Sequence, residues 1–158
     1  MRRLALFLAA LWWGGISGLS FLAVPTLFAQ LGSPAVAGPV AARLFSLQCY
    51  AGLLIGMALL VLLRRERGAA VEHGATPTPE DLARAQQVLA TMGFVLLGMM
   101  LALVQEFGVA HQIVTARASG GNLRLWHGLG SVLVFGQWLC AGAVLWRLAA
   151  PRRSVSPA

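Results

Sequence analysis

Residues 44–63 read LFSLQCYAGLLIGMALLVLL, and residues 64–67, which follow directly, read RRER. The first stretch carries no charged side chain, whereas every side chain of the second is charged. A helix rises about 1.5 Å per residue, so about 20 apolar residues cross the roughly 30 Å hydrocarbon core of a bilayer. Because the charged cluster cannot enter lipid cheaply, this stretch predicts a membrane-spanning helix that ends at Leu63.

The whole chain has the composition of a membrane protein. Of its 158 residues 58% are apolar and 11% are charged, and the mean hydropathy is +0.76. A typical soluble domain is about 25% charged, so a soluble globular fold is excluded. The P-loop, the dinucleotide-binding fingerprint and the His-Glu-x-x-His motif of soluble enzymes are missing from the sequence, and we expect no enzyme.

Three further stretches of similar length and composition follow the same pattern. They cover residues 4–24, 88–109 and 125–146. Together with residues 44–63 they make four spans, which a chain of this length accommodates as a single domain over residues 1–158. The sequence therefore predicts an all-α fold, namely an integral membrane four-helix bundle.

Prolines and a helix-start signal mark several ends of these spans. We expect the first span to end at Pro25. Thr78-Pro79-Glu80-Asp81 predicts the start of the third helix, because Thr78 can cap it and the two acids meet the positive end of the helix dipole. Between the second and third spans, residues 64–87 contain a polar, proline-containing stretch, and we predict a flexible connection there.

The arginines predict how the spans are oriented. All 12 basic residues are Arg, which gives a net charge of +7 and a pI of about 11.5. Nine of them lie at the two termini and in the 64–87 connection, and three lie in the other two connections. Short Arg-rich segments resist translocation, so both termini and the 64–87 connection are predicted to face the cytoplasm. The use of Arg in place of every Lys fits a GC-rich coding bias, which indicates a bacterial source and hence a bacterial inner membrane. The charge then lies beside lipid headgroups, and nucleic acid is not an expected partner.

Two glycine pairs predict close helix contacts. Gly14 and Gly18 in the first span, and Gly52 and Gly56 in the second, have the four-residue spacing that lets helix backbones approach one another. We expect these pairs to line contacts inside the bundle. An interface between copies of the chain, or with another membrane protein, is the alternative.

The cysteines and tryptophans are interpreted as structural residues. Cys49 and Cys140 are predicted at depths that differ by more than the roughly 7 Å that a disulfide allows, so both should be free packing residues. The tryptophans lie largely toward span ends, where an aromatic belt anchors helices at the membrane surface. They are Trp12, Trp13, Trp126, Trp138 and Trp146.

Glu106 is the only acid that lies at membrane depth in the predicted spans. An ionisable side chain there is costly, so it is by default a hypothesis about function and it needs a partner. Arg124 and His127 lie at the start of the fourth span and are predicted at comparable depth. One interpretation is a structural ion pair of Glu106 with Arg124 or Arg43.

The second interpretation is a small polar site that opens to the outer side of the membrane. Its members would be Glu106, His111 and His127, with Gln48, Gln105 and Gln112 around them. Imidazole and carboxylate groups suit a transition metal, and the same groups can bind a cation or relay a proton. A haem would need two histidines that face each other across the bundle, which His111 and His127 do not obviously do, so no cofactor is predicted.

Short apolar motifs in both hairpins resemble a known family. They are Leu11-Trp12-Trp13-Gly14-Gly15, Phe21, Pro25, Leu27-Phe28, Ala41-Ala42-Arg43-Leu44-Phe45 and Arg124-Leu125-Trp126-His127. This pattern resembles the bacterial branch of the transmembrane protein 205-like domain family, formerly a domain of unknown function. The resemblance implies an integral four-helix membrane protein with no established catalytic activity and no catalytic residues to carry over. It also implies that the first span is retained, although its start has the shape of a cleaved signal peptide.

Two hypotheses about function follow. The first is an inner-membrane protein of unknown molecular function that serves as a structural or accessory subunit of a membrane complex, with the lipid bilayer and another membrane protein or a second copy as its partners. The alternative is binding or transport of a metal ion or a proton at an outward-facing site around Glu106 and His127.

Overall fold

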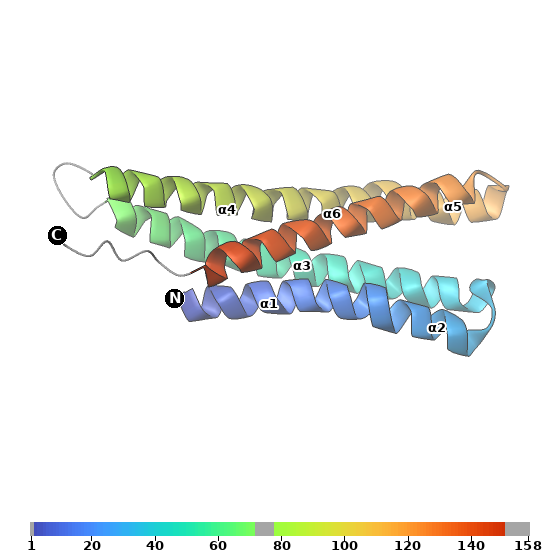
Figure 1. Ribbon diagram of the computed structural model, residues 1–158. Coiled ribbons are helices and arrows are strands. Elements are labelled where there is room, and N and C mark those ends of the chain that lie inside the picture. The colour runs from blue at the N-terminus through green and yellow to red at the C-terminus, as the bar shows by residue number, and fades with distance from the viewer. Residues whose placement is uncertain (1, 72–77, 151–158) are drawn as a thin grey trace.

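The computed structural model describes residues 2–71 and 78–150, and the elements found there are all helices. They form four long segments that run side by side and alternate in direction (Figure 1). Each segment is long and apolar enough to cross a membrane. The predicted all-α, four-helix architecture is therefore confirmed.

Two of the four segments are continuous α-helices and two contain a wider, π-helical stretch. The first segment comprises α1 (Arg2–Gly18), the π-helical η1 (Leu19–Ala23) and α2 (Val24–Leu31). The second is α3 (Pro34–Val71). The third comprises α4 (Pro79–Leu103), the π-helical η2 (Val104–Ala110) and α5 (His111–Ser119). The fourth is α6 (Leu123–Ala149).

The two ends of the bundle are distinguished below by the chain segments that lie there. At the terminal end α1 begins and α6 ends, and α3 ends beside the start of α4 (Figure 1). At the far end α2 leads into α3, and α5 leads into α6. Gly32 and Gly120 make the two turns at the far end with φ of 61° and 73°, a backbone conformation that costs glycine little.

The first helix does not end at Pro25, so that prediction was wrong. Proline lacks an N–H group and crowds the carbonyl of the preceding turn, which ordinarily kinks or ends a helix. Here the turn before Pro25 widens, because the Val24 N–H bonds to the carbonyl of Leu19, five residues back. The π-helical turn absorbs the proline, and the helix continues to Leu31.

Within the predicted 64–87 connection, residues 64–71 are helical and not flexible, and the residues from Pro79 onward are helical as the Thr78 signal predicts. Helix α3 continues through the arginine cluster to Val71, and α4 begins at Pro79. Arg and Glu are good helix formers, and Arg84 joins the two helices through a 3.2 Å salt bridge to Glu66. Residues 72–77 of this connection lie outside the described residues.

The predicted helix start at Thr78 is confirmed. The Asp81 N–H donates to the Thr78 side-chain oxygen over 3.2 Å, and the Thr78 N–H donates to the Asp81 carboxylate over 3.1 Å. This reciprocal pair is a capping box, which satisfies two backbone donors at the start of α4.

The core lies in the half of the bundle nearer the terminal end. Its largest fully buried side chains come from α1, α3, α4 and α6, and they are Trp12, Leu59, Leu63, Val95 and Val144. Trp12 is 1% exposed, so it is a core residue and not the membrane-surface anchor that its sequence position suggested. The predicted anchoring position does suit Trp146, which is 80% exposed at the end of α6.

The two glycine pairs differ in their surroundings. A Cβ added at Gly52 would lie 2.9 Å from the Trp12 ring, and one added at Gly56 would lie 2.7 Å from Met99. A Cβ added at Gly14 or Gly18 would meet nothing within 4 Å. Gly14 and Gly18 do not line a contact inside the described bundle, because they lie on the exposed face of α1, opposite the buried Trp12 face.

Candidate functional site

Polar side chains from all four segments gather beyond Trp12, in the half of the bundle nearer the far end. This set, here termed the polar junction, consists of Ser20 from η1, Ser46 and Gln48 from α3, Gln105 and Glu106 from η2, and Gln137 from α6. Both π-helical stretches contribute to it. Such stretches occur frequently at functional sites, because the widened turn places side chains where a regular helix does not.

Glu106 is joined to α3 at the outer edge of the junction. The Ser46 hydroxyl donates a 2.7 Å hydrogen bond to the Glu106 carboxyl group. Both side chains are half-buried. The other acids among the described residues lie at the terminal end, Glu66 in the last part of α3 and Glu80 and Asp81 in the first turn of α4. Glu106 is therefore the isolated carboxyl group of the apolar part of the bundle.

The structure pairs Glu106 with Ser46 and not with an arginine. Among residues 2–71 and 78–150, the ion pair that is formed joins Arg84 to Glu66. The predicted third span ended at residue 109, which placed Glu106 near the far end. In the structure the third segment continues as far as Ser119, so Glu106 lies deeper in the bundle. Glu106 therefore lies about 20 Å along the helix from that end, whereas Arg124 is the second residue of α6.

The two histidines do not join Glu106 in a cluster. His111 begins α5, His127 lies one turn into α6, and both are exposed. The described part of the chain contains no group of three or more His, Cys, Asp or Glu side chains that could hold a metal ion. Glu106 instead turns toward Ser46, and the metal-ligand set that the sequence suggested is not assembled there.

A second interhelical link lies next to Glu106. The Gln137 side-chain N–H donates a hydrogen bond to the side-chain oxygen (Oε1) of Gln105, which joins α6 to η2. Gln137 is 6% exposed and is one of two buried polar side chains in the described chain. Cys49 adds a third link, because its thiol contacts the Ala102 carbonyl over 3.4 Å. These bonds hold α3, α6 and the third segment together where apolar packing is thinner.

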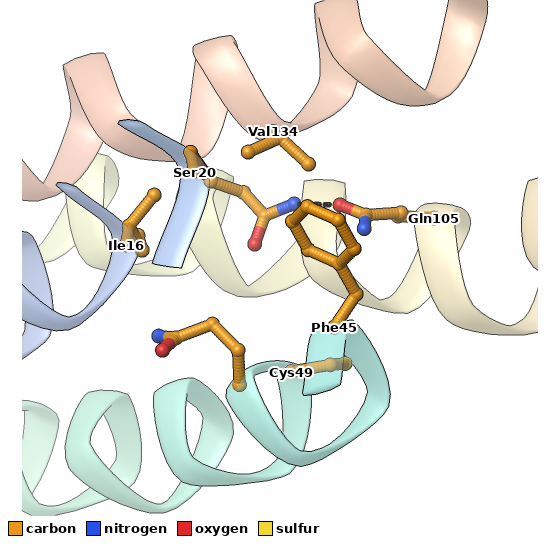
Figure 2. Close-up of a pocket in the computed structure, with 8 residues that line it drawn as sticks. Ile16, Ser20, Phe45, Cys49, Gln105 and Val134 are labelled. Atoms are coloured by element: carbon orange, nitrogen blue, oxygen red, sulfur yellow. Dashed lines mark hydrogen bonds between the residues drawn. The ribbon is translucent and has the colours of Figure 1, made fainter. Parts of the chain in front are cut away.

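A small cavity separates these links from η1. It measures about 10 Å³ and is lined by Ile16, Ser20, Phe45, Gln48, Cys49, Gln105, Val134 and Gln137. Figure 2 shows Ser20 and Ile16 on one side of the cavity, Phe45 and Cys49 from α3 below it, and Gln105 beyond Phe45. A space of this size holds about one water molecule.

The polar junction stops at the apolar core. Trp12, packed closely between Gly52 and Gly98, closes the bundle on the terminal side of the cavity. On the cavity side of Trp12, the Trp138 ring N–H donates to the Ser17 hydroxyl over 2.9 Å. Near the terminal end, Arg147 donates to Thr91 over 3.0 Å and Arg2 donates to the Leu148 carbonyl. The arrangement suits a binding site inside the bundle better than a continuous path across it.

Sequence reasoning found part of this site and missed the rest. It identified Glu106, Gln48 and Gln105, but it overlooked Ser20, Ser46 and Gln137. Gln137 carries a signal that could have been used, because an amide in the middle of an apolar span is costly to bury without a partner. Ser46 carries no such signal, since a helical serine ordinarily bonds to its own backbone.

The fold and the site define the class of protein: a multi-pass, four-helix membrane protein with a buried polar junction. The chain belongs to the family described as a domain of unknown function, DUF4149, whose model matches residues 7–122. The prediction of an uncharacterised domain family is thereby confirmed. The matched range contains Ser46, Gln105 and Glu106 but ends just before α6, which supplies Gln137. No curated protein and no solved structure matches the chain.

Proposed function

We propose that this protein works in the bacterial inner membrane through reversible proton binding at Glu106. The observation that carries the proposal is the partner of Glu106, the Ser46 hydroxyl. A hydroxyl can donate a hydrogen bond to an ionised carboxylate and can accept one from a protonated carboxyl group, so the pair serves both protonation states. An arginine partner would instead hold the carboxylate ionised.

The surroundings favour a proton over a transition metal as the species bound. Nitrogen and sulfur ligands suit transition metals, but the two histidines lie exposed and Cys49 is engaged with a backbone carbonyl. A proton needs only the carboxyl group and its hydrogen-bond partner. The cavity beside Gln105 is also too small for a solute larger than water without a rearrangement of the helices.

Infrared difference spectroscopy on the protein in lipid nanodiscs tests this proposal. A protonated carboxyl group gives a carbonyl band that an ionised one lacks. The other four acids of the chain give bands of the same kind, so we expect one component of the pH-dependent carbonyl signal, and not the whole signal, to be lost in Glu106→Gln. In Ser46→Ala that component should move to higher frequency, because the carboxyl group loses its hydrogen-bond partner.

Glu80→Gln is the matched control, since Glu80 is an exposed acid in the first turn of α4. In Glu80→Gln the component that comes from Glu106 should remain as in the wild type. A pH-dependent carbonyl signal that is the same in the wild type and in Glu106→Gln would overturn the proposal. So would a carbonyl band from Glu106 that keeps the same intensity from acid to alkaline pH.

A second proposal is that the protein is an accessory subunit of a membrane complex. The exposed face of α1 supports it, since Gly14 and Gly18 leave a shallow strip where another helix backbone can approach. Crosslinking in intact membranes through a cysteine placed at Gly14 should trap a partner or a second copy. The same substitution at Gly93, which is also open but lies on α4, is the control. Equal, background-level crosslinking at both positions would contradict the accessory role.

We also propose that the family assignment extends to the transmembrane protein 205-like proteins, which the short motifs in both hairpins resemble.

We further propose that the terminal end faces the cytoplasm. The nine-to-three distribution of arginines supports the orientation. Reporter fusions at the C-terminus and within the turn at Gly120 should show opposite locations. A periplasmic C-terminus would contradict the orientation.

A further inference from the structure

The Ser20 hydroxyl differs from the other helical hydroxyl groups of this chain. Several serines and threonines donate to the carbonyl four residues back, which is the usual solution in a membrane helix. They are Ser17, Thr91, Thr115, Ser119 and Ser131. Ser46 donates to Glu106 instead. Ser20 has a buried hydroxyl oxygen that bonds to no partner in the described part of the chain.

The cavity beside Ser20 has the size and the lining that a water molecule requires. A buried water needs about 10–15 Å³ of free space and two to four polar partners. The cavity measures about 10 Å³, and its polar lining consists of Ser20 and the three amides of Gln48, Gln105 and Gln137. Apolar atoms make up most of the cavity surface, and four hydrogen-bonding side chains supply the polar atoms that a bound water needs.

The chemistry of the lining assigns roles to the individual groups. Gln137 uses its amide nitrogen to donate to Gln105, which leaves its carbonyl oxygen as an acceptor facing this region. Ser20 supplies a hydroxyl that can donate or accept, and Gln48 supplies both an amide donor and a carbonyl acceptor. A water molecule has two donors and two acceptors, so it can bond to all three side chains at once.

We infer that one water molecule is bound in this cavity by Ser20, Gln48 and Gln137. This water joins η1 to α3 and α6, close to the direct bond of 2.9 Å that the Trp138 ring N–H on α6 donates to the Ser17 hydroxyl on α1. The inference goes beyond proton binding at Glu106 and does not depend on it, because it rests on the Ser20 hydroxyl and the cavity alone. It makes the junction a hydrogen-bonded unit that includes all four segments.

X-ray radiolysis in ¹⁸O-labelled water tests the site directly. Radiolysis turns a bound water into a hydroxyl radical, which oxidises the side chains beside it. Cys49 lines the cavity, whereas Cys140 is equally buried against Trp12 and Gly98 and does not line it. We expect Cys49 to be oxidised several-fold faster than Cys140. Equal, slow oxidation of both cysteines would overturn the inference.

Ser20 variants provide the second measurement. Ser20→Val fills the cavity with a methyl group and should reduce Cys49 oxidation to the Cys140 rate. Ser20→Ala should lower the Tm, because the water loses a ligand. If the cavity were dry, removing an unbonded hydroxyl would instead raise the Tm. Ser131→Ala is the control, since Ser131 bonds to its own helix on the surface and its removal should change the Tm little.

Discussion

The two halves of the bundle are built from the same four segments but are held together in different ways. Near the terminal end, buried apolar side chains close around Trp12. Toward the far end, hydrogen bonds between side chains replace much of that packing, and both π-helical stretches lie in this half. The first half explains why the fold is stable. The second half departs from regular helix geometry and holds the carboxyl group that is expensive to keep there.

This difference indicates where the function of the chain lies. In a bilayer, close packing holds helices together, because moving an apolar side chain from lipid into the bundle gives little hydrophobic gain. A bundle that needed only stability could be packed throughout in the manner of the Trp12 region. The Gln105–Gln137 bond joins helices in the polar half, whereas Glu106 is costly to place there, and we propose that it is present for proton binding.

The largest expected effect concerns the apolar half. Trp12→Ala removes the largest fully buried side chain and should lower the free energy of unfolding by about 3 kcal/mol. Thermal or denaturant unfolding in detergent measures this loss. Trp146→Ala, which changes the same residue type at an exposed position, should cost less than about 0.5 kcal/mol. Similar losses in the two variants would remove the distinction between the halves.

Alanine substitutions in the two glycine pairs should change the free energy of unfolding in opposite directions. Gly52→Ala brings a methyl group to 2.9 Å from the buried Trp12 ring and should destabilise the fold by about 1 kcal/mol. Gly14→Ala meets open space, and because alanine favours helix it should stabilise the fold by up to about 1 kcal/mol. Unfolding curves of the two variants decide the matter. A destabilised Gly14→Ala would show that this face of α1 is packed after all.

In the polar half the expected losses are smaller. Gln137→Leu removes the bond to Gln105 and should cost about 1 kcal/mol. A double-mutant cycle with Gln105→Leu isolates the pair, and we expect a coupling energy of about 0.6 kcal/mol or more. Zero coupling would mean that the two amides do not bond to each other in the membrane.

The smallest effect is expected outside the apolar part, at the terminal end. Glu66→Gln breaks the bond to Arg84 between the exposed extensions of α3 and α4. Ion pairs at such positions contribute little, so stability should fall by less than about 0.5 kcal/mol and the loss should shrink further at high salt. A loss comparable to that of Trp12→Ala would show that the helical extensions, and not the core, determine the stability of the bundle.

The sequence predicted the fold well because the controlling signals are local. Apolar runs of bilayer length and the Thr78 capping signal can both be recognised in the sequence without knowledge of the tertiary structure. The sequence did not predict that the first helix continues past Pro25. That continuation depends on a π-helical turn, which leaves no periodic pattern in the sequence. The same limit applies to η2, where widened turns alter which side chains share a face.

The site was predicted in part. Glu106 stood out because charge is scarce in the spans, but its partner could not be read from the sequence. The sequence placed Arg124 and His127 at about the same membrane depth as Glu106. The partner in the structure is Ser46, because α3 packs against η2. Partner choice inside a bundle depends on the rotation of each helix about its axis, and an apolar sequence constrains that rotation weakly.

The most direct test compares one acid from each region by solid-state NMR. With ¹³C-labelled glutamate in lipid-embedded protein, the carboxyl signals of Glu106 and Glu80 can be assigned through their Gln variants and followed as the pH changes. Our account predicts that the Glu106 signal changes between a protonated and an ionised position, and that Ser46→Ala alters the Glu106 signal but not that of the exposed Glu80. A Glu106 signal that stays at one position throughout, or that is the same in Ser46→Ala as in the wild type, would contradict it.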